Sequence, residues 1–315
     1  MRTVVMSRAD RMARLPTVAG AAPELHAGAH RIPVSTTTFA CRGHLGRGQS
    51  SIAPATGVGL SLCHAACYTR IMERPRIVVL TGAGMSAESG IATFRDALTG
   101  LWPRFDPAEL ACEKGFRRDP ALVWGWYRWR AAQLMGCEPN AGHRGLAMLA
   151  DAGHDLHIVT QNVDDLHERA GSPDVLHLHG QLLRSRCIDC GAMREPEPML
   201  QSLGQVTAEG TREPPPRCEV CGGDYRPGVV WFGEALPEAA WRDAAALAGA
   251  CELMVVIGTS SLVQPAASLP LLAKRNGARI IEINPQAAPL SASADEHWAC
   301  GAAEGVARLR DLLRH

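Results

Sequence analysis

Two short cysteine motifs of identical spacing are the strongest chemical signal in the chain. Cys187 and Cys190 form one CxxC motif, and Cys218 and Cys221 form a second one after 27 intervening residues. Four thiolates match the tetrahedral coordination of a structural Zn²⁺, which leaves no open position for water. Glycines follow each pair and free the backbone at the turn. We therefore predict a closed structural zinc site, and the alternative is a pair of CxxC redox disulfides.

Histidines supply a second candidate for chemistry. His177 and His179 stand two apart in LHLHG (176–180), so they share a face if this segment is extended. A neutral histidine, with an ordinary pKa of about 6.5, can accept a proton near neutral pH and act as a general base. From the residues alone, two other interpretations stay open, namely core histidines or a pair of metal ligands.

A glycine-rich turn follows the first predicted strand. IVVL (77–80) is short, apolar and β-branched, which is typical of a parallel strand covered on both faces. The turn and the start of a helix follow directly: Gly82, Ala83, Gly84, Ser86 and Glu88. Strand, glycine turn and helix together can hold a pyrophosphate on backbone N–H groups. The spacing G-x-G-x5-G (82–90) differs from the dehydrogenase fingerprint, and a tight turn without a ligand is the alternative.

Three later segments complete the elements needed to position these groups. They are LHIVTQNVD (156–164), ELMVVIGTSS (252–261) and ARIIEINPQ (278–286). Each pairs an apolar strand with small or polar residues at its carboxyl end, where open α/β sheets bind their ligands. The fold class that we predict is α/β, a doubly wound parallel sheet (Rossmann-like) with a small inserted zinc module.

Composition limits the partners and the compartment. The chain has 315 residues, enough for a large core, and its 32 Lys and Arg balance its 32 Asp and Glu. This balance gives no bulk field that would attract nucleic acid or an acidic membrane. The odd number of cysteines, 11, favours a reducing compartment, and no apolar run reaches the roughly 18 residues of a membrane span. We expect a cytoplasmic monomer with no nucleic-acid or membrane partner.

The first 71 residues differ from the rest, because they show neither helical nor strand periodicity. Up to Arg74 the chain holds nine arginines and three acids. One interpretation is a disordered N-terminal extension (1–71) that cannot bury enough apolar surface to fold. A second is an organelle-targeting peptide, which would make the protein mitochondrial. A third is that translation begins at Met72.

A series of motifs in the remaining chain resembles the sirtuins, NAD-dependent protein-lysine deacylases. The matching stretches are GAGMSAESGIATFRD (82–96), EPNAGH (138–143), TQNVDDLHERAG (160–171), LHLHG (176–180), the two CxxC motifs, GVVWFGEALP (228–237), GTSSLVQPA (258–266) and EINP (282–285). The resemblance implies a deacylase domain (72–315) that uses NAD⁺ and one structural Zn²⁺. It also implies a helical insertion at about 103–145 and a zinc module at about 183–226.

The resemblance also implies roles for individual residues. His179 is the expected catalytic base, and GVVWFGE offers a strand to the acylated peptide through Val230, Phe232, Gly233 and Glu234. The acyl group passes from lysine to ADP-ribose, which gives free lysine, nicotinamide and O-acyl-ADP-ribose. The expected cofactor-binding residues are Gly82, Ala83, Gly84, Ser86, Glu88, Phe94, Arg95, Trp102, Gln161, Asn162, Asp164, Gly258, Thr259, Ser260, Asn284, Pro285, Gln286 and Ala303.

The acyl preference is indicated by one predicted helix. Tyr127 and Arg130 stand three apart and therefore share a helix face. Together with the later Asn140, they resemble the sirtuin subgroup that removes succinyl and malonyl groups, since a guanidinium and a phenol can bind a terminal carboxylate. Ala111 falls where that subgroup keeps a small residue. We predict a desuccinylase and demalonylase with weaker deacetylase activity.

Other functions stay open at this point. If Arg130 is an ordinary surface arginine, the chain is mainly a deacetylase. A mono-ADP-ribosyltransferase on the same scaffold is a second alternative, and a non-catalytic nucleotide-sensing or zinc-scaffold protein is a third.

Overall fold

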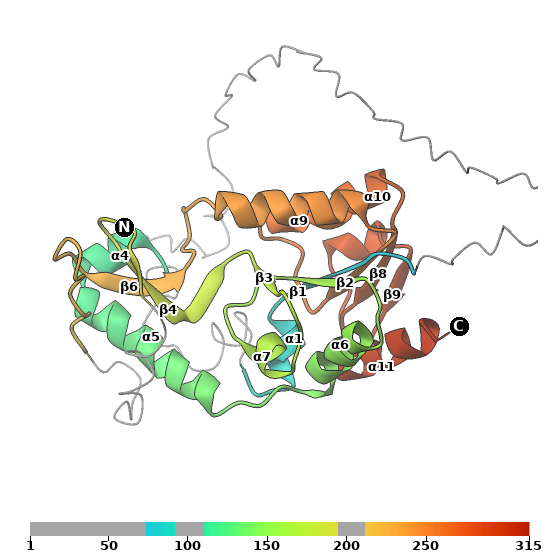
Figure 1. The fold of residues 1–315 in the computed structure, drawn as a ribbon, viewed down its shortest axis with the longest axis horizontal. Helices are drawn as coiled ribbons and strands as arrows, with labels where there is room; N and C mark the ends of the chain where they lie inside the picture. The colour runs from blue at the N-terminus through green and yellow to red at the C-terminus, as the bar shows by residue number, and fades with distance from the viewer. Residues whose placement is uncertain (1–73, 92–109, 195–211, 315) are drawn as a thin grey trace, which may run out of the picture. The chain divides into compact units, whose positions relative to one another are not determined.

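The computed structural model describes residues 74–91, 110–194 and 212–314 (Figure 1). Three of the predicted cofactor residues, Phe94, Arg95 and Trp102, lie outside the described residues, and so does the predicted extension 1–71. In the part of the chain that is described, no helix combines the length and the apolar composition that a membrane span needs.

A six-stranded parallel sheet forms the centre of the described residues. Its strands run in the order β3-β2-β1-β7-β8-β9. Their bounds are β1 (Ile77–Thr81), β2 (Leu156–Thr160), β3 (Leu176–His177), β7 (Leu253–Ile257), β8 (Arg279–Ile283) and β9 (Glu296–Trp298). The predicted doubly wound sheet is confirmed, and the carboxyl ends of β1, β2, β7 and β8 meet at one edge.

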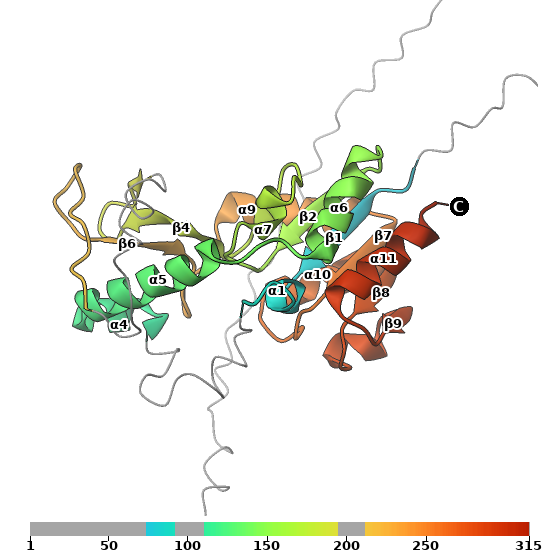
Figure 2. The ribbon, with the colours of Figure 1, turned by 90° about the horizontal axis from the view of Figure 1, so that it is seen from below.

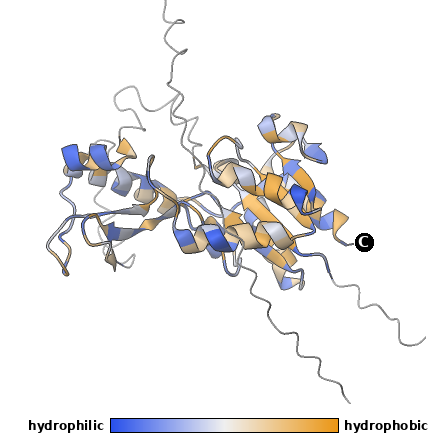
Figure 3. Ribbon diagram, turned by 90° about the horizontal axis from the view of Figure 1, so that it is seen from above, coloured by the Kyte–Doolittle hydropathy of each residue, from blue (hydrophilic) through white to orange (hydrophobic). Residues whose placement is uncertain are grey.

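Burial on both faces explains why these apolar runs form strands. All five residues of β1 and all five of β7 are buried, and Figure 3 shows the strands of this sheet in the hydrophobic colour. Alternate side chains face opposite layers, because successive residues of a strand point to opposite sides. Val79 packs in one core cluster with Leu146 and Val306, whereas Val78 packs in another with Ala244 and Leu269.

Helices cover the two faces of the sheet (Figure 1). On one face, α6 (Ala141–Asp151) and α11 (Ala302–Leu312) lie against each other (Figure 2), near the short α1 (Gly84–Ala87) and α7 (Leu166–Arg169). On the other face, α9 (Glu238–Ala250) packs with α10 (Leu269–Arg275). Two 3₁₀ turns follow strands of the sheet: Ala266–Ser268 lies between β7 and α10, and Pro289–Ala292 lies between β8 and β9.

A second, antiparallel sheet carries the two CxxC motifs. It has the order β5-β4-β6, with β4 (Gly180–Cys187), β5 (Met193–Arg194) and β6 (Tyr225–Val229). Two helices, α4 (Glu113–Arg118) and α5 (Pro120–Met135), pack against this sheet. Their shared core contains Phe116, Tyr127, Cys187, Cys218 and Trp231.

The sequence sets the ends of α5 clearly. The carboxylate of Asp119 accepts a hydrogen bond from the N–H of Leu122 at 3.1 Å, which caps the first turn. Pro120 follows at the first helical position, where its missing N–H costs nothing. Gly136 ends the helix. Tyr127 and Arg130 therefore sit on a helix whose register is fixed at both ends.

Candidate active site and metal site

The glycine turn packs directly against the loop that follows β7. The N–H of Gly82 donates to the carbonyl of Ile257 at 2.9 Å, and the N–H of Gly84 donates to that of Gly258 at 2.8 Å. A Cβ on Gly84 would lie only 2.7 Å from the Cα of Gly258. The sequence suggested that these glycines admit a phosphate, and the structure adds that they let two strand-end loops touch. The helix that follows, α1, has only four residues.

Amide side chains at the strand ends converge on Thr259. The Nε2 of Gln161 donates to Thr259 Oγ1 at 3.1 Å, and the Nδ2 of Asn284 donates to the carbonyl of Thr259 at 2.9 Å. The ends of β2, β7 and β8 are thus joined by side-chain hydrogen bonds. Ser260 follows β7 in this region, and Pro285 and Gln286 follow Asn284.

The predicted cofactor residues near α1 lie either at the ends of this helix, as Ala83 and Glu88 do, or buried within it, as Ser86 is. Ala83 precedes the first helical residue, Gly84, and Glu88 follows the last one. The Oε1 atom of Glu88 accepts a hydrogen bond from the N–H of Ala303 at 3.1 Å, which ties α1 to the start of α11. Ser86 points inward and is completely buried.

A buried chain of hydrogen bonds leads from Asn162 to Asp164. Asn162 Nδ2 donates to Ser86 Oγ at 3.2 Å, and Ser86 Oγ donates to Asp164 Oδ2 at 2.9 Å. Burial raises the pKa of Asp164 above its usual value, although the bonds from Ser86 and from the N–H of Leu166 oppose this shift. The second carboxylate oxygen accepts that N–H at 3.2 Å, so Asp164 also supports the start of α7. Asp165, at the N-cap, makes no side-chain cap bond.

His179 is oriented as a base. Its Nδ1 lies 2.9 Å from the carbonyl oxygen of Gln161. Because a carbonyl oxygen can only accept a hydrogen bond, Nδ1 carries the proton. The Nε2 atom is therefore the nitrogen left with a lone pair. Burial lowers the pKa of His179 below its usual value, and the bond to Gln161 partly opposes this. The imidazole is neutral at pH 7, as a proton acceptor requires.

His177 has a different environment. Its Nδ1 donates to the carbonyl of Asn162 at 3.1 Å, and its Nε2 lies 2.6 Å from Glu168 Oε1. Its two nitrogens are thus used to fix the loop after β2. A metal ion needs at least three His, Cys, Asp or Glu side chains close together. Among the described residues, only the four cysteines form such a group.

Two further buried histidines were not assigned a role from the sequence. His143 accepts the N–H of Asn140 through Nδ1 at 3.3 Å, and its ring packs edge-on against that of His167 at 4.8 Å. Burial and the nearby Arg144 lower the pKa of His143 to about 4, and burial lowers that of His167 well below its usual value. Both rings are neutral at pH 7. Both lie in motifs that carry the sirtuin resemblance, so this resemblance was the sequence signal that could have identified them.

The predicted acyl-binding side chains lie together on α5. Tyr127 is 2% exposed, and its hydroxyl accepts the indole N–H of Trp231 at 2.9 Å. The guanidinium of Arg130 lies 5.0 Å from the ring centre of Trp126 and 5.8 Å from that of Tyr127. Burial lowers the pKa of Arg130, against the attraction of Tyr127 and Asp164. Burial also raises the pKa of Tyr127 to about 12, so its phenol stays protonated.

Ala111 and the expected peptide strand meet at one hydrogen bond. The N–H of Phe232 donates to the carbonyl of Ala111 at 3.0 Å, and Ala111 is partly buried against the core cluster of α4 and α5. The strand itself is shorter than GVVWFGE suggested, because β6 ends at Val229. Beyond that point Glu234 folds back, and its carboxylate accepts the N–H of Trp231 at 2.8 Å. This local bond replaces strand pairing.

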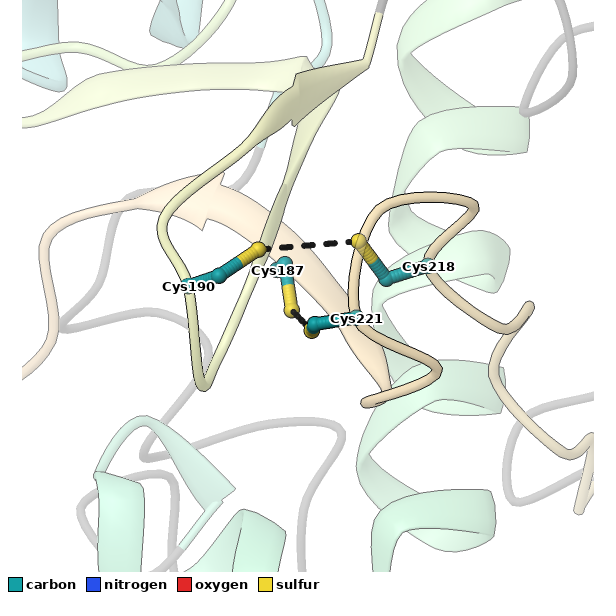
Figure 4. A group of neighbouring side chains, drawn as sticks. All are labelled: Cys187, Cys190, Cys218 and Cys221. Carbon is teal, nitrogen blue, oxygen red and sulfur yellow. Dashed lines mark hydrogen bonds between the residues drawn. The ribbon is translucent and has the colours of Figure 1, made fainter.

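The four cysteine side chains converge on one point (Figure 4). The sulfurs of Cys187 and Cys221 are 3.5 Å apart, those of Cys190 and Cys218 are 3.7 Å apart, and all four lie within 4.8 Å of one another. Tetrahedral Zn–S bonds of about 2.3 Å place sulfurs roughly 3.8 Å apart, so the cluster fits a structural Zn²⁺.

The turns around the cluster fit the same conclusion. Gly191 and Gly222 both adopt a positive φ, at 73° and 76°, which the sequence predicted from the glycines after each pair. Their N–H groups donate to the carbonyls of Cys187 and Cys218 at 3.1 Å and 2.8 Å. The backbone N–H of Asp189 donates to the sulfur of Cys187, and that of Gly223 donates to the sulfur of Cys221. Such hydrogen bonds stabilise thiolates.

Comparison with known proteins assigns the family. The Sir2 family profile matches residues 82–265, and the chain belongs to the Sir2 family. A Pseudomonas aeruginosa protein named NAD-dependent protein deacylase 1 is 57% identical over 211 residues, which is 67% of this chain and 83% of that protein. A Methylococcus capsulatus NAD-dependent protein deacylase is 49% identical over 78% of this chain and 94% of its own.

Solved structures agree with this assignment. A crystal structure of a Sir2 homologue–NAD complex has a TM-score of 0.68 and 45% identity, and the match covers 77% of this chain and 90% of that one. A second, described as Sir2 with p53 peptide and NAD⁺, has a TM-score of 0.63 and 31% identity over 76% of this chain and 94% of its own. The family and the fold class predicted from the sequence are confirmed.

Proposed function

We propose that this chain is a protein-lysine deacylase that prefers acyl groups ending in a carboxylate, such as succinyl and malonyl, over acetyl groups. The enzyme class, NAD-dependent protein deacylase with NAD⁺ as co-substrate, follows from the Sir2 family and from the shared name of the relatives. The four-cysteine cluster fits its structural Zn²⁺. The acyl preference rests on the side chains of α5.

Arg130 is the observation that carries the acyl preference. Its guanidinium is partly buried between aromatic rings and, within the described residues, has no hydrogen-bonded carboxylate. By contrast, the neighbouring Arg128 is paired with Glu213 at 2.7 Å. A guanidinium in a partly desolvated site without a hydrogen-bonded carboxylate is costly, and a carboxylate at the end of an acyl chain lowers that cost. An acetyl group offers no such carboxylate.

The remaining roles follow from the geometry at the strand ends. NAD⁺ supplies the ribose that receives the acyl group as nicotinamide leaves. His179 accepts a proton at Nε2, since Nδ1 is held by Gln161. Asp164 and Asn162, fixed through Ser86, present polar groups at the same edge of the sheet. These assignments extend the family match to this chain's own residues.

The substrate peptide is proposed to lie along residues 230–234. The N–H groups of Val230, Trp231 and Phe232 already donate to the carbonyl of His179, to Glu234 and to the carbonyl of Ala111. A peptide would therefore bind this segment mainly by donating its own N–H groups to carbonyl oxygens. The solved Sir2–p53 peptide–NAD⁺ structure supports a peptide as the substrate class.

One comparison tests the acyl preference. Matched acetyl, succinyl and malonyl peptides are incubated with NAD⁺, and peptide mass and nicotinamide release are followed. The variant Arg130→Met should lower kcat/KM for the succinyl peptide by roughly 10- to 150-fold, the value of one charged hydrogen bond, and change deacetylation little.

The exposed Arg144→Met is the matched control, because it removes one positive charge from the surface of α6. It should leave the ratio of desuccinylation to deacetylation unchanged. If Arg130→Met lowers both activities equally, the proposed acyl recognition is wrong and the chain is mainly a deacetylase. ADP-ribose found on the peptide, with the acyl group retained, would instead support an ADP-ribosyltransferase.

A further inference from the structure

A tryptophan outside α5 contacts the acyl-binding tyrosine. Trp231 follows β6, and Tyr127 lies 104 residues earlier, on α5. Both side chains are 2% exposed. The indole Nε1–H of Trp231 donates to the hydroxyl oxygen of Tyr127 at 2.9 Å, and the ring centres are 6.4 Å apart. This bond joins the peptide segment to the helix that carries Arg130.

The direction of this hydrogen bond fixes the direction of the phenolic proton. An indole N–H can only donate, so the oxygen of Tyr127 is the acceptor. The proton of Tyr127 must then point away from Trp231. Because burial raises the pKa of Tyr127 to about 12, that proton is present throughout the working pH range. In the described part of the chain, the hydroxyl makes no other hydrogen bond.

Two donors therefore share one site. The guanidinium of Arg130 carries only N–H donors, and the phenol of Tyr127 offers an O–H donor. The guanidinium has no acceptor for the phenolic proton, so a group that satisfies both donors must be an acceptor. A carboxylate has two acceptor oxygens, whereas the methyl end of an acetyl group has none.

Trp231 is itself held firmly. The guanidinium carbon of Arg226 lies 3.3 Å from its ring centre, and the ring of Phe116 lies 5.5 Å away. Its backbone N–H donates to Glu234, which is also paired with Arg226. A ring fixed on several sides keeps its N–H in one position, which is what an orienting donor requires.

We propose that Trp231 is a positioning residue that determines selectivity for acidic acyl groups by fixing the hydroxyl of Tyr127 as a donor to the acyl carboxylate. This inference rests on the proposed function, since it concerns the same acyl site. Trp231 does not touch the carboxylate itself. It acts through Tyr127 alone.

The test is a double-mutant cycle with the full chain. The variants are Trp231→Phe, Tyr127→Phe and both together, each assayed with succinyl and acetyl peptides. Trp231→Phe should raise KM for the succinyl peptide about 3- to 10-fold more than it raises KM for the acetyl peptide, a ratio that corresponds to one neutral hydrogen bond. In the Tyr127→Phe background the same substitution should have no further effect.

A second variant separates the N–H from packing. Site-specific replacement of Trp231 by benzothienylalanine nearly keeps the shape of the ring and puts a sulfur atom, which cannot donate a hydrogen bond, in place of the N–H. It should reproduce the selective rise in KM without changing the unfolding temperature. An equal loss on both peptides, or a loss that persists without the Tyr127 hydroxyl, would overturn the proposal.

The outcome is distinguishable from a failure of the proposed function. If Arg130→Met shows no acyl selectivity, the proposed function itself fails. If Arg130→Met is selective but neither Trp231 variant is, acidic acyl recognition stands and only the role of Trp231 is refuted.

Discussion

The close contact between Gly84 and Gly258 predicts how much an added side chain would destabilise the two loops that are expected to bind the cofactor. Gly258 has a φ of 62°, and a Cβ there would lie 2.4 Å from the carbonyl carbon of Gly84 and 2.5 Å from the nitrogen of Met85. Gly258→Ala should therefore combine two costs. Left-handed backbone costs about 1 to 2 kcal/mol for a residue with a Cβ, and forcing extra volume into packed backbone costs about 1 to 3 kcal/mol.

Two matched variants separate these costs. Gly277→Ala has the same left-handed conformation, φ 93°, but nothing within 4 Å of the new Cβ, so it isolates the backbone cost. Gly84→Ala has no positive φ but would meet Gly258 at 2.7 Å, so it isolates the overlap. We expect Gly258→Ala to lower the free energy of unfolding by about 2 to 5 kcal/mol, more than either of the other two variants.

Thermal unfolding and NAD⁺ titration measure both consequences. A change of 1 kcal/mol shifts the unfolding temperature of a domain of this size by about 2 to 4 °C. Gly258→Ala and Gly84→Ala should also weaken NAD⁺ binding, because the displaced loops carry Thr259 and the glycine turn. Gly277→Ala, in an exposed turn after α10, should leave NAD⁺ binding unchanged. If Gly258→Ala is no more destabilising than Gly277→Ala, the loops do not pack as described.

Three further predictions concern the metal, the base and one ion pair. Removing Zn²⁺ with a chelator should abolish activity together with the near-UV circular dichroism of the second sheet's aromatic core, and activity lost with that spectrum intact would contradict a structural role. Because the pKa of His179 is lowered, kcat/KM should rise with pH around an inflection below about 6.5, and a pH profile with an inflection above that value would refute the assignment. Glu234→Gln should destabilise the chain by about 3 kcal/mol in urea unfolding at pH 7, since it leaves the buried Arg226 without its counter-charge. Burial alone would raise the pKa of Glu234, but the hydrogen bond from Arg226 lowers it. The stability that Glu234 contributes is therefore present above its unfolded pKa of about 4.3 and is lost as the pH falls through its folded pKa. The wild-type and Glu234→Gln proteins should then converge in stability at low pH, and a constant difference down to pH 3 would argue against the pairing.

The sequence predicted the parts of this protein whose residue patterns are local. IVVL and LMVVI are apolar on every residue because β1 and β7 are buried on both faces, so their pattern identifies them as strands. The CxxC motifs predicted the cysteine cluster for a similar reason, since each turn is completed within four residues. The Trp-rich run 124–129 also has a local explanation, because Trp124 and Trp126 are buried in the core.

Contacts between distant segments could not be predicted in this way. Nothing in GAG or in GTSS indicates that Gly84 touches Gly258, because that contact depends on how two strands align in the sheet. The hydrogen bond between Trp231 and Tyr127 joins two motifs that are far apart in the sequence, and neither motif indicates a contact with the other. The early end of β6 at Val229 depends on Glu234 folding back to the N–H of Trp231.

The shared core of α4, α5 and the zinc sheet bears on how this enzyme can be re-engineered. Phe116 and Tyr127 belong to the same buried cluster as Cys187, Cys218 and Trp231. The helix proposed to recognise the acyl group and the sheet that carries the cysteine cluster therefore share one core and would have to be exchanged together. A chimera that imports only α5 from a relative would inherit half of an interface, whereas one that imports 110–135, 180–194 and 212–234 together would transfer acyl selectivity along with its support.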